Sequence, residues 1–173
     1  MDSALERQFL DYSAGKLDQL TQRIATCLGQ LTVEQVWARG GENENAVGNL
    51  VLHLCGNVRQ WIVSGVGGRP DIRQRDREFS ARGGVSSAEL IERLRATVEE
   101  AAAVIHAVTA ARLADKLVIQ GYSVSVMEAI YHVVEHFSMH TGQIIFATKL
   151  LTGTDLGFYA HLRTAAAHGE KTP

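Results

Sequence analysis

Three histidines stand four residues apart in one segment of the chain, at His132, His136 and His140. In a helix, residues i and i+4 lie one above the other, so these imidazoles can line one side of a helix. Imidazole nitrogen is the commonest protein ligand for transition metals. The spacing therefore predicts part of a metal site that needs a further ligand from another segment. It fits equally well a row of ordinary hydrogen-bonded histidines on a helix flank.

The three histidines do not occupy equivalent positions on such a helix. At about 100° per residue, from ~3.6 residues per turn, His140 lies nearest the centre of the apolar face. His136 lies about 40° further round, and His132 another ~40° beyond it. We therefore expect His136 and His140 to point into the flank of the interior. His132 is expected on the outer shoulder, where it can support His136 or a bound water.

A candidate for the missing ligand lies in a polar row on an earlier predicted helix, made by Asn49, His53, Asn57 and Gln60. This row borders an apolar face, so it is either a partly solvated shoulder or the wall of a polar pocket. If the two helices are antiparallel neighbours, His53 can meet His136 and His140 at one level. Three histidines suit zinc or nickel, with manganese or iron as alternatives, and they leave a coordination position for water or substrate.

The pattern specifies no reaction by itself. It is not the His-Glu-x-x-His motif of zinc proteases. Glu135 lies about 100° round from His136, and neither it nor Glu128 is directed at the ligands as a general base. Arg73 and Arg75 could hold a substrate carboxylate through bidentate contacts, although a solvated, ion-paired loop explains them as well. No catalytic residue can be named from the spacing.

Four long helices are predicted to position these residues. Apolar residues recur at helical spacing over the ranges 3–28, 46–64, 86–108 and 125–151. Capping-box patterns stand at Ser3, Ser86 and Ser125, and at Thr32 before a single helical turn; Asn43 or Asn45 is the expected cap of the second long helix. Residues 67–85 form a long connection without predicted structure, and 116–120 a short extended piece. We expect an all-α four-helix bundle with a long crossover that makes helices two and three parallel.

Composition restricts the class of protein. At 173 residues, 46% hydrophobic and 21% charged, the chain has an ordinary globular composition, and we expect one domain over 1–160 with a C-terminal tail over 161–173. A formal net charge of −2 gives no reason to expect nucleic acid as a partner. We expect no membrane partner either, because no apolar run approaches the ~20 residues that span a bilayer. The start of the chain has no signal-peptide pattern, so a cytoplasmic location is expected, with Cys27 and Cys55 as free thiols.

Three segments resemble the DinB-like superfamily: NLVLHLCGNVRQW at 49–61, RQRDREF at 73–79 and HVVEHFSMHTGQ at 132–143. The resemblance covers roughly residues 5–160. It implies a four-helix bundle with a long crossover after the second helix, and a divalent metal held by His53, His136 and His140. It also implies a homodimer. Some members of this superfamily transfer low-molecular-weight thiols such as bacillithiol, mycothiol or glutathione.

Several functions remain open. A metal-dependent thiol S-transferase in detoxification or stress response is the first hypothesis, because a metal lowers the pKa of a bound thiol. A metal-binding stress or interaction protein without turnover, a metal-dependent hydrolase, and a metal-free structural dimer are the alternatives.

Overall fold

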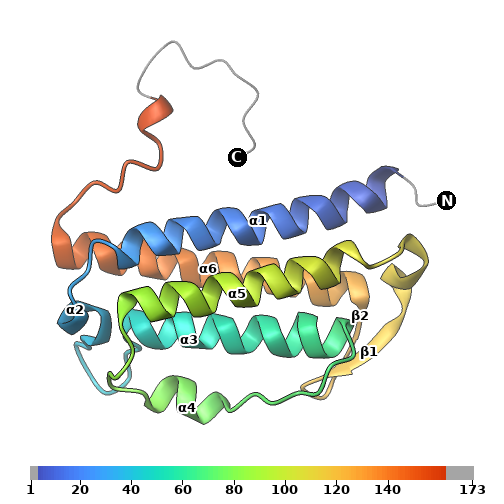
Figure 1. Cartoon of the computed structure of the whole chain (residues 1–173), viewed down its shortest axis with the longest axis horizontal. Helices are drawn as coiled ribbons and strands as arrows, with labels where there is room; N and C mark the ends of the chain where they lie inside the picture. The colour runs from blue at the N-terminus through green and yellow to red at the C-terminus, as the bar shows by residue number, and fades with distance from the viewer. Residues whose placement is uncertain (1–3, 163–173) are drawn as a thin grey trace.

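Four long helices form an elongated bundle in the computed structural model, which describes residues 4–162 (Figure 1). The all-α fold expected from the sequence is confirmed. The four long helices are α1 (Ala4–Leu28), α3 (Val47–Val58), α5 (Ser87–His106) and α6 (Val126–Thr152). The π-helix η1 (Arg59–Val66) continues α3. The shorter elements are α2 (Val33–Trp37), α4 (Arg75–Ser80), the 3₁₀ turns η2 (Ala110–Ala114) and η3 (Ala160–Leu162), and the strands β1 (Lys116–Ile119) and β2 (Tyr122–Ser125).

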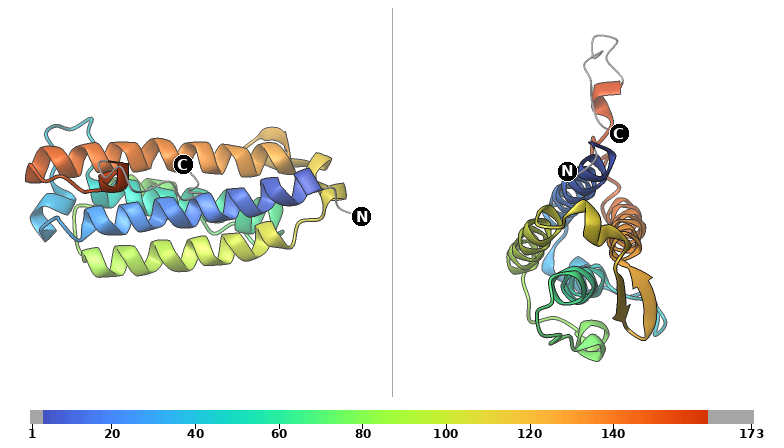
Figure 2. Two further views of the ribbon diagram at one scale, coloured as in Figure 1. Left: turned by 90° about the horizontal axis from the view of Figure 1, so that it is seen from above. Right: turned by 90° about the vertical axis from the view of Figure 1, so that its right-hand side faces the viewer.

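The helix directions follow from the long crossover. α3 and α5 run parallel, while α1 and α6 run in the opposite direction, so α3 and α6 are antiparallel (Figure 1). The crossover contains α4, a helix that the sequence did not predict within residues 67–85. Six residues are too few for a hydrophobic period, and such a short helix depends on tertiary contacts. α4 lies on the side of α3 that faces away from α1 (Figure 2).

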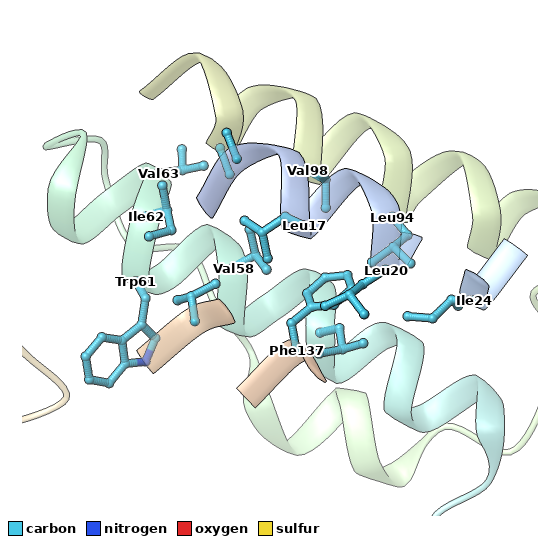
Figure 3. Packing of buried hydrophobic residues seen from close by; sticks show 14 of the residues in the cluster. Leu17, Leu20, Ile24, Val58, Trp61, Ile62, Val63, Leu94, Val98 and Phe137 are labelled. Atoms are coloured by element: carbon cyan, nitrogen blue, oxygen red, sulfur yellow. The ribbon is translucent and has the colours of Figure 1, made fainter. Parts of the chain in front are cut away.

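The bundle packs around a single apolar core. Leu17 of α1, Leu94 of α5 and Phe137 of α6 are almost completely buried, and they lie together in the centre (Figure 3). Each is at the inward position of its helical repeat, which is why the apolar period of the sequence predicts them. Cys27 and Cys55 are free thiols, as expected. Within residues 4–162, no helix is long and apolar enough to cross a membrane.

Three helices begin at the capping boxes that the sequence predicts. Thr32, Ser86 and Ser125 each accept a hydrogen bond from the backbone three residues on. The expected cap of α3 at Asn43 or Asn45 is wrong, because Ala46 occupies that position and the side-chain oxygen of Asn49 accepts its N–H at 3.2 Å. The predicted cap at Ser3 and residues 163–173 of the expected tail lie outside the described residues.

The other ends of the helices are set by glycine and by a hairpin. α6 ends at Gly153, whose φ of 66° is readily available only to glycine. The extended piece expected at 116–120 is β1, and it pairs antiparallel with β2, a strand that the sequence did not predict. This hairpin lies beside α3 and α6 (Figure 2). The hairpin and the crossover therefore flank the two helices that carry the candidate ligands.

Candidate metal centre

The antiparallel pairing of α3 and α6 brings three of the predicted histidines together. The Nε2 atoms of His53 and His136 are 3.1 Å apart, and those of His140 and His136 are also 3.1 Å apart. One nitrogen from each ring lies within 4.8 Å of the others. His53 is buried on α3, and the other two rings are partly buried on α6. These side chains could hold a metal ion.

The spacing of the nitrogens fits a shared metal ion. Two imidazole nitrogens bound to one tetrahedral zinc at 2.0–2.1 Å lie about 3.3–3.4 Å apart, and right-angled coordination brings them to about 2.9 Å. The 3.1 Å separations lie between these values. Lone pairs on nitrogens this close repel one another unless a cation or a proton lies between them. A divalent ion gives all three nitrogens a partner at once.

One of the rings is held in the tautomer that a metal needs, and a second lies against a carboxylate. His140 Nδ1 lies 2.7 Å from Gln143 Oε1, whereas His53 Nδ1 lies 3.0 Å from both Glu78 Oε2 and Arg73 Nη2. Because the Gln143 oxygen is an acceptor, Nδ1 of His140 carries the proton and Nε2 keeps its lone pair. Donation from His53 Nδ1 to the Glu78 carboxylate gives His53 the same tautomer. His136 Nδ1 is buried and has no hydrogen-bond partner among residues 4–162. The His53–Glu78 contact is the carboxylate–histidine arrangement common behind metal ligands.

Glu78 is itself fixed by a buried arginine. Arg73 Nε donates to Glu78 Oε1 and Arg73 Nη2 donates to Oε2, each at 2.8 Å, and the two side chains are only 4% and 9% exposed. Burial opposes ionisation of Glu78, but the hydrogen bonds from Arg73 and His53 outweigh it and lower its pKa. A Cβ at Gly56 would lie 1.9 Å from Glu78 Oε1, so only glycine lets this pair pack against α3. The crossover therefore supplies an ionised carboxylate to His53.

A wider polar network ties the crossover and the hairpin to this pair. Arg73 Nη1 donates to Gln60 Oε1 at 2.9 Å, and Gln120 of the hairpin turn donates to the same oxygen. Asn49 donates to the carbonyl oxygens of Glu78 and Ala81 at 2.8 and 3.0 Å. Of the polar row expected from the sequence, Gln60 and Asn49 thus bind the crossover. These bonds explain why α4 forms where it does.

The environment keeps the histidines of α6 neutral. The pKa of His136 is lowered to about 3, mainly by burial and then by the neighbouring His140, His53 and His132 and the Arg73 guanidinium. Burial also lowers the pKa of His140, against the opposing effect of its bond to Gln143. Neutral imidazole is the form that binds metal. The rings are therefore ready to bind a metal at neutral pH without first losing a proton.

A cavity of about 550 Å³ opens beside the histidines. Its lining combines α3, the crossover, the hairpin and α6, with His53, Asn57, Trp61, Arg73, Arg75, Gln120, Tyr122, Val124, Glu128, His132 and His136. This volume falls within the ~300–1,000 Å³ typical of small-molecule sites. Trp61 stacks against His132, with ring centroids 4.2 Å apart. Two of the three clustered histidines, His53 and His136, thus lie in the wall of a pocket with aromatic and polar walls.

The remaining predicted residues take distinct positions around this pocket. His132 lies on the wall, its ring centroid 5.7 Å from that of His136. Asn57 lines the pocket, and its Oδ1 is buried without a partner among the described residues. The alternative of a solvated, ion-paired loop is half right for Arg73. Its side chain is ion-paired, but it is buried and not solvated. Arg75 is exposed at the rim and lies over the Phe79 ring, 4.8 Å from its centroid.

Sequence reasoning missed the carboxylate behind His53 and most of the hairpin wall. Glu78 stands within the segment RQRDREF, but the sequence assigned it no role. An acidic residue inside that segment was the available signal. Nothing local in the sequence points to Tyr122 or Val124, because their place depends on a strand pairing that the sequence did not reveal.

Comparisons with known proteins place the chain in a family. The family model described as "Protein of unknown function (DUF1572)" matches residues 4–162. The chain belongs to the DUF1572 family. A crystal structure described as "the conserved protein of locus from Enterococcus faecalis" is similar to this DUF1572 chain with a TM-score of 0.72 and 16% sequence identity, covering 83% of this chain and 97% of that one. At that identity the likeness establishes the fold alone. No curated protein matches the chain.

Proposed function

We propose that this DUF1572 chain is a divalent-metal-dependent enzyme of the DinB-like superfamily, with the metal held by His53, His136 and His140. The observation that carries the proposal is the cluster of three imidazole nitrogens within 4.8 Å of one another, beside a 550 Å³ cavity whose wall includes His53 and His136. Three protein ligands beside an open pocket are typical of catalytic sites, whereas structural zinc sites are closed by four. Zinc or nickel suits three imidazoles best, and manganese or iron are alternatives.

The substrate class that we propose is a low-molecular-weight thiol, which the protein transfers to an electrophile in detoxification or stress response. A bound divalent ion supplies a Lewis acid that lowers the pKa of a thiol. The protein's own thiols are unsuited to the task. Burial raises the pKa of Cys27, and it raises that of Cys55 to about 12, so neither is a thiolate at neutral pH. The thiol must therefore come from outside the chain.

The residues of the pocket have separate tasks in this proposal. Trp61, Tyr122 and Val124 provide apolar surface for the body of the substrate. Arg75 is exposed at the rim and is free to pair with a substrate carboxylate. Arg73 already binds Glu78 with two nitrogens, so its task is to hold the carboxylate behind His53. Arg73 is thus a positioning residue rather than a substrate ligand.

Hydrolysis ranks below thiol transfer, because the acids at the pocket are engaged. Glu128 accepts the Ser125 N–H at 2.6 Å, and its bonds to Ser125 and Lys116 lower its pKa to about 2. Glu78 is bound by Arg73. A general base for water needs a free carboxylate or imidazole with a pKa nearer neutrality. A metal-binding protein without turnover is the remaining alternative, and it needs no such base.

We further propose that two copies of the chain pair through the outer face of α6. This face exposes five large apolar side chains to between 48% and 75%, which are Met127, Tyr131, Met139, Phe146 and Leu150. Gly142 lies at its centre with open space around it. A glycine inside a helix costs about 1 kcal/mol relative to alanine, and a closely approaching second helix would account for it.

The charges on this face are arranged for an antiparallel pair. Glu135 and Lys149 are both exposed, and neither has an ion-pair partner within residues 4–162. They stand at equal distances in sequence before and after Gly142. A twofold axis at Gly142 therefore sets Glu135 of one copy against Lys149 of the other, twice. The same axis sets Phe146 opposite the small Ser138.

Thiol consumption by metal-loaded protein tests the proposed reaction. Glutathione, bacillithiol and mycothiol are each incubated with a panel of electrophiles, and loss of free thiol is followed. We expect faster loss of one thiol with wild type than with His136→Ala. If metal raises the thermal stability of the protein but none of the thiols is consumed faster than with His136→Ala, the centre is non-catalytic and the enzyme proposal fails.

A further inference from the structure

A second cavity, of about 360 Å³, lies between α3, the crossover, α4 and α5, and contains none of the histidines. Four arginines from these different segments line it, which are Arg59, Arg73, Arg77 and Arg93. The acidic residues of its lining are Asp71 and Glu78. The lining therefore carries an excess of two positive charges, in a chain whose formal net charge is −2.

The acids of this cavity are already hydrogen-bonded by internal partners. Asp71 accepts the Gln60 side-chain amide at 2.6 Å and the Arg73 backbone N–H at 3.0 Å. Glu78 has both oxygens bound by Arg73. Neither carboxylate has to bind a further arginine of this lining. The charge excess is therefore carried by the other arginines.

Two of those arginines differ from the rest in their partners within the described part of the chain. Arg59 donates to Glu100 at 2.7 Å. The guanidinium groups of Arg77, on α4, and Arg93, on α5, have no hydrogen-bond or ion-pair partner among residues 4–162, and both residues are exposed. Bonds from the N-cap of α5 lower the pKa of Glu89, and the charge of Arg93 lowers it further without a direct bond. A guanidinium presents a planar fork of donors that matches a carboxylate or a phosphate. Two unpaired forks at one cavity form a site for an oxyanion.

The cavity has room for more than the anion. Leu52 and the 72% exposed Ile72 add apolar surface to its lining. Its volume is at the lower end of the ~300–1,000 Å³ of small-molecule sites. We propose that this cavity binds a small organic oxyanion, with its carboxylate or phosphate between Arg77 and Arg93 and its apolar part against Leu52 and Ile72. The proposal does not depend on the reaction proposed for the metal centre.

Calorimetric titration with three probes that share a benzene ring tests this site. Phenyl phosphate and phenylacetate carry the two candidate anions, and benzyl alcohol is the uncharged control. We expect at least one anion to bind with a dissociation constant of about 1 mM or below, and the alcohol not to bind. The tighter of the two anions identifies the group that the site selects.

Variants then locate the binding. Arg77→Gln/Arg93→Gln should weaken it by about 10- to 100-fold, from the loss of charged hydrogen bonds. Arg95→Gln is the matched control, because Arg95 is an exposed arginine of α5 that does not line the cavity, and it should bind as wild type does. His140→Ala should also retain binding, which separates this cavity from an anion bound to metal. Circular dichroism verifies that each variant folds.

Any of four results overturns the proposal. The first is the absence of binding by either anion at about 10 mM. The second is unchanged affinity in Arg77→Gln/Arg93→Gln. The third is an equal loss in Arg95→Gln, which would indicate non-specific attraction to surface charge. The fourth is loss of binding in His140→Ala, which would place the anion at the histidines.

Discussion

The apolar core and the polar centre of this bundle are built from adjacent residues of α6 but are held in opposite ways. Phe137 is fully buried and packs by shape in the apolar core, so another apolar side chain of similar volume could fill its place. His136, the preceding residue, belongs to a chain of directed contacts that continues through His53 and Glu78 to Arg73. In such a chain each group is the hydrogen-bond partner of the next. Removal of one member leaves another buried without its partner.

The largest effect is expected from breaking the buried ion pair. Glu78→Gln leaves the Arg73 guanidinium buried without its counter-charge, and such a loss costs about 3–5 kcal/mol of unfolding free energy. Glu78→Gln/Arg73→Met removes both charges and should cost less than the single change. Urea unfolding of the metal-free proteins measures both values. A double variant that is no more stable than the single variant would show that the two side chains are not coupled.

The apolar core should lose stability without losing the site. Leu17→Ala, on α1, should cost about 2–5 kcal/mol, from lost burial and the cavity left behind. Because Leu17 lies outside the pocket lining, metal affinity of the folded variant should equal that of wild type. Urea unfolding and metal titration at low temperature measure the two quantities. A large loss of affinity would mean that the core and the centre are not separable.

Metal affinity should respond to the carboxylate behind His53. In Glu78→Gln/Arg73→Met, His53 Nδ1 faces a neutral amide in place of an ionised carboxylate, and loss of such a partner weakens metal binding by about 10- to 100-fold. Competition with a chromophoric chelator measures the affinity. Arg82→Met, an exposed arginine at the end of the crossover, serves as the control and should bind as wild type does. Unchanged affinity in the double variant would mean that Glu78 does not orient His53.

This contrast between core and centre also explains how much could be predicted from sequence. Leu17 and Phe137 follow the helical period, and the capping boxes at Ser86 and Ser125 are local, so these features could be predicted. The sequence also predicts that the three histidines meet, because this needs only an antiparallel pair of helices. Glu78 could not be assigned, since its position depends on bonds from Asn49 and Arg73 across the fold. β2 could not be predicted either, because its four residues form a strand only by pairing with β1.

The smallest effect is expected at the outer face of α6. Glu135→Lys sets like charges against each other in the proposed antiparallel pair, and Lys149→Glu does the same. Each should weaken dimerisation by about 0.5–1 kcal/mol per exposed ion pair, while Glu135→Lys/Lys149→Glu should restore it. Sedimentation velocity over a range of concentrations measures the association. A wild-type chain that stays monomeric, or a double variant no better than the singles, would contradict this pairing.

Elemental analysis of the purified protein tests the metal centre most directly. After loading with zinc or nickel and removal of excess metal, wild type should retain about one ion per chain, the number that one set of three histidines can hold. His136→Ala should retain almost none. His106→Ala, at an exposed histidine outside the pocket lining, should retain as much as wild type. Equal metal content in His136→Ala and wild type, or no metal in wild type, would contradict the assignment of His53, His136 and His140.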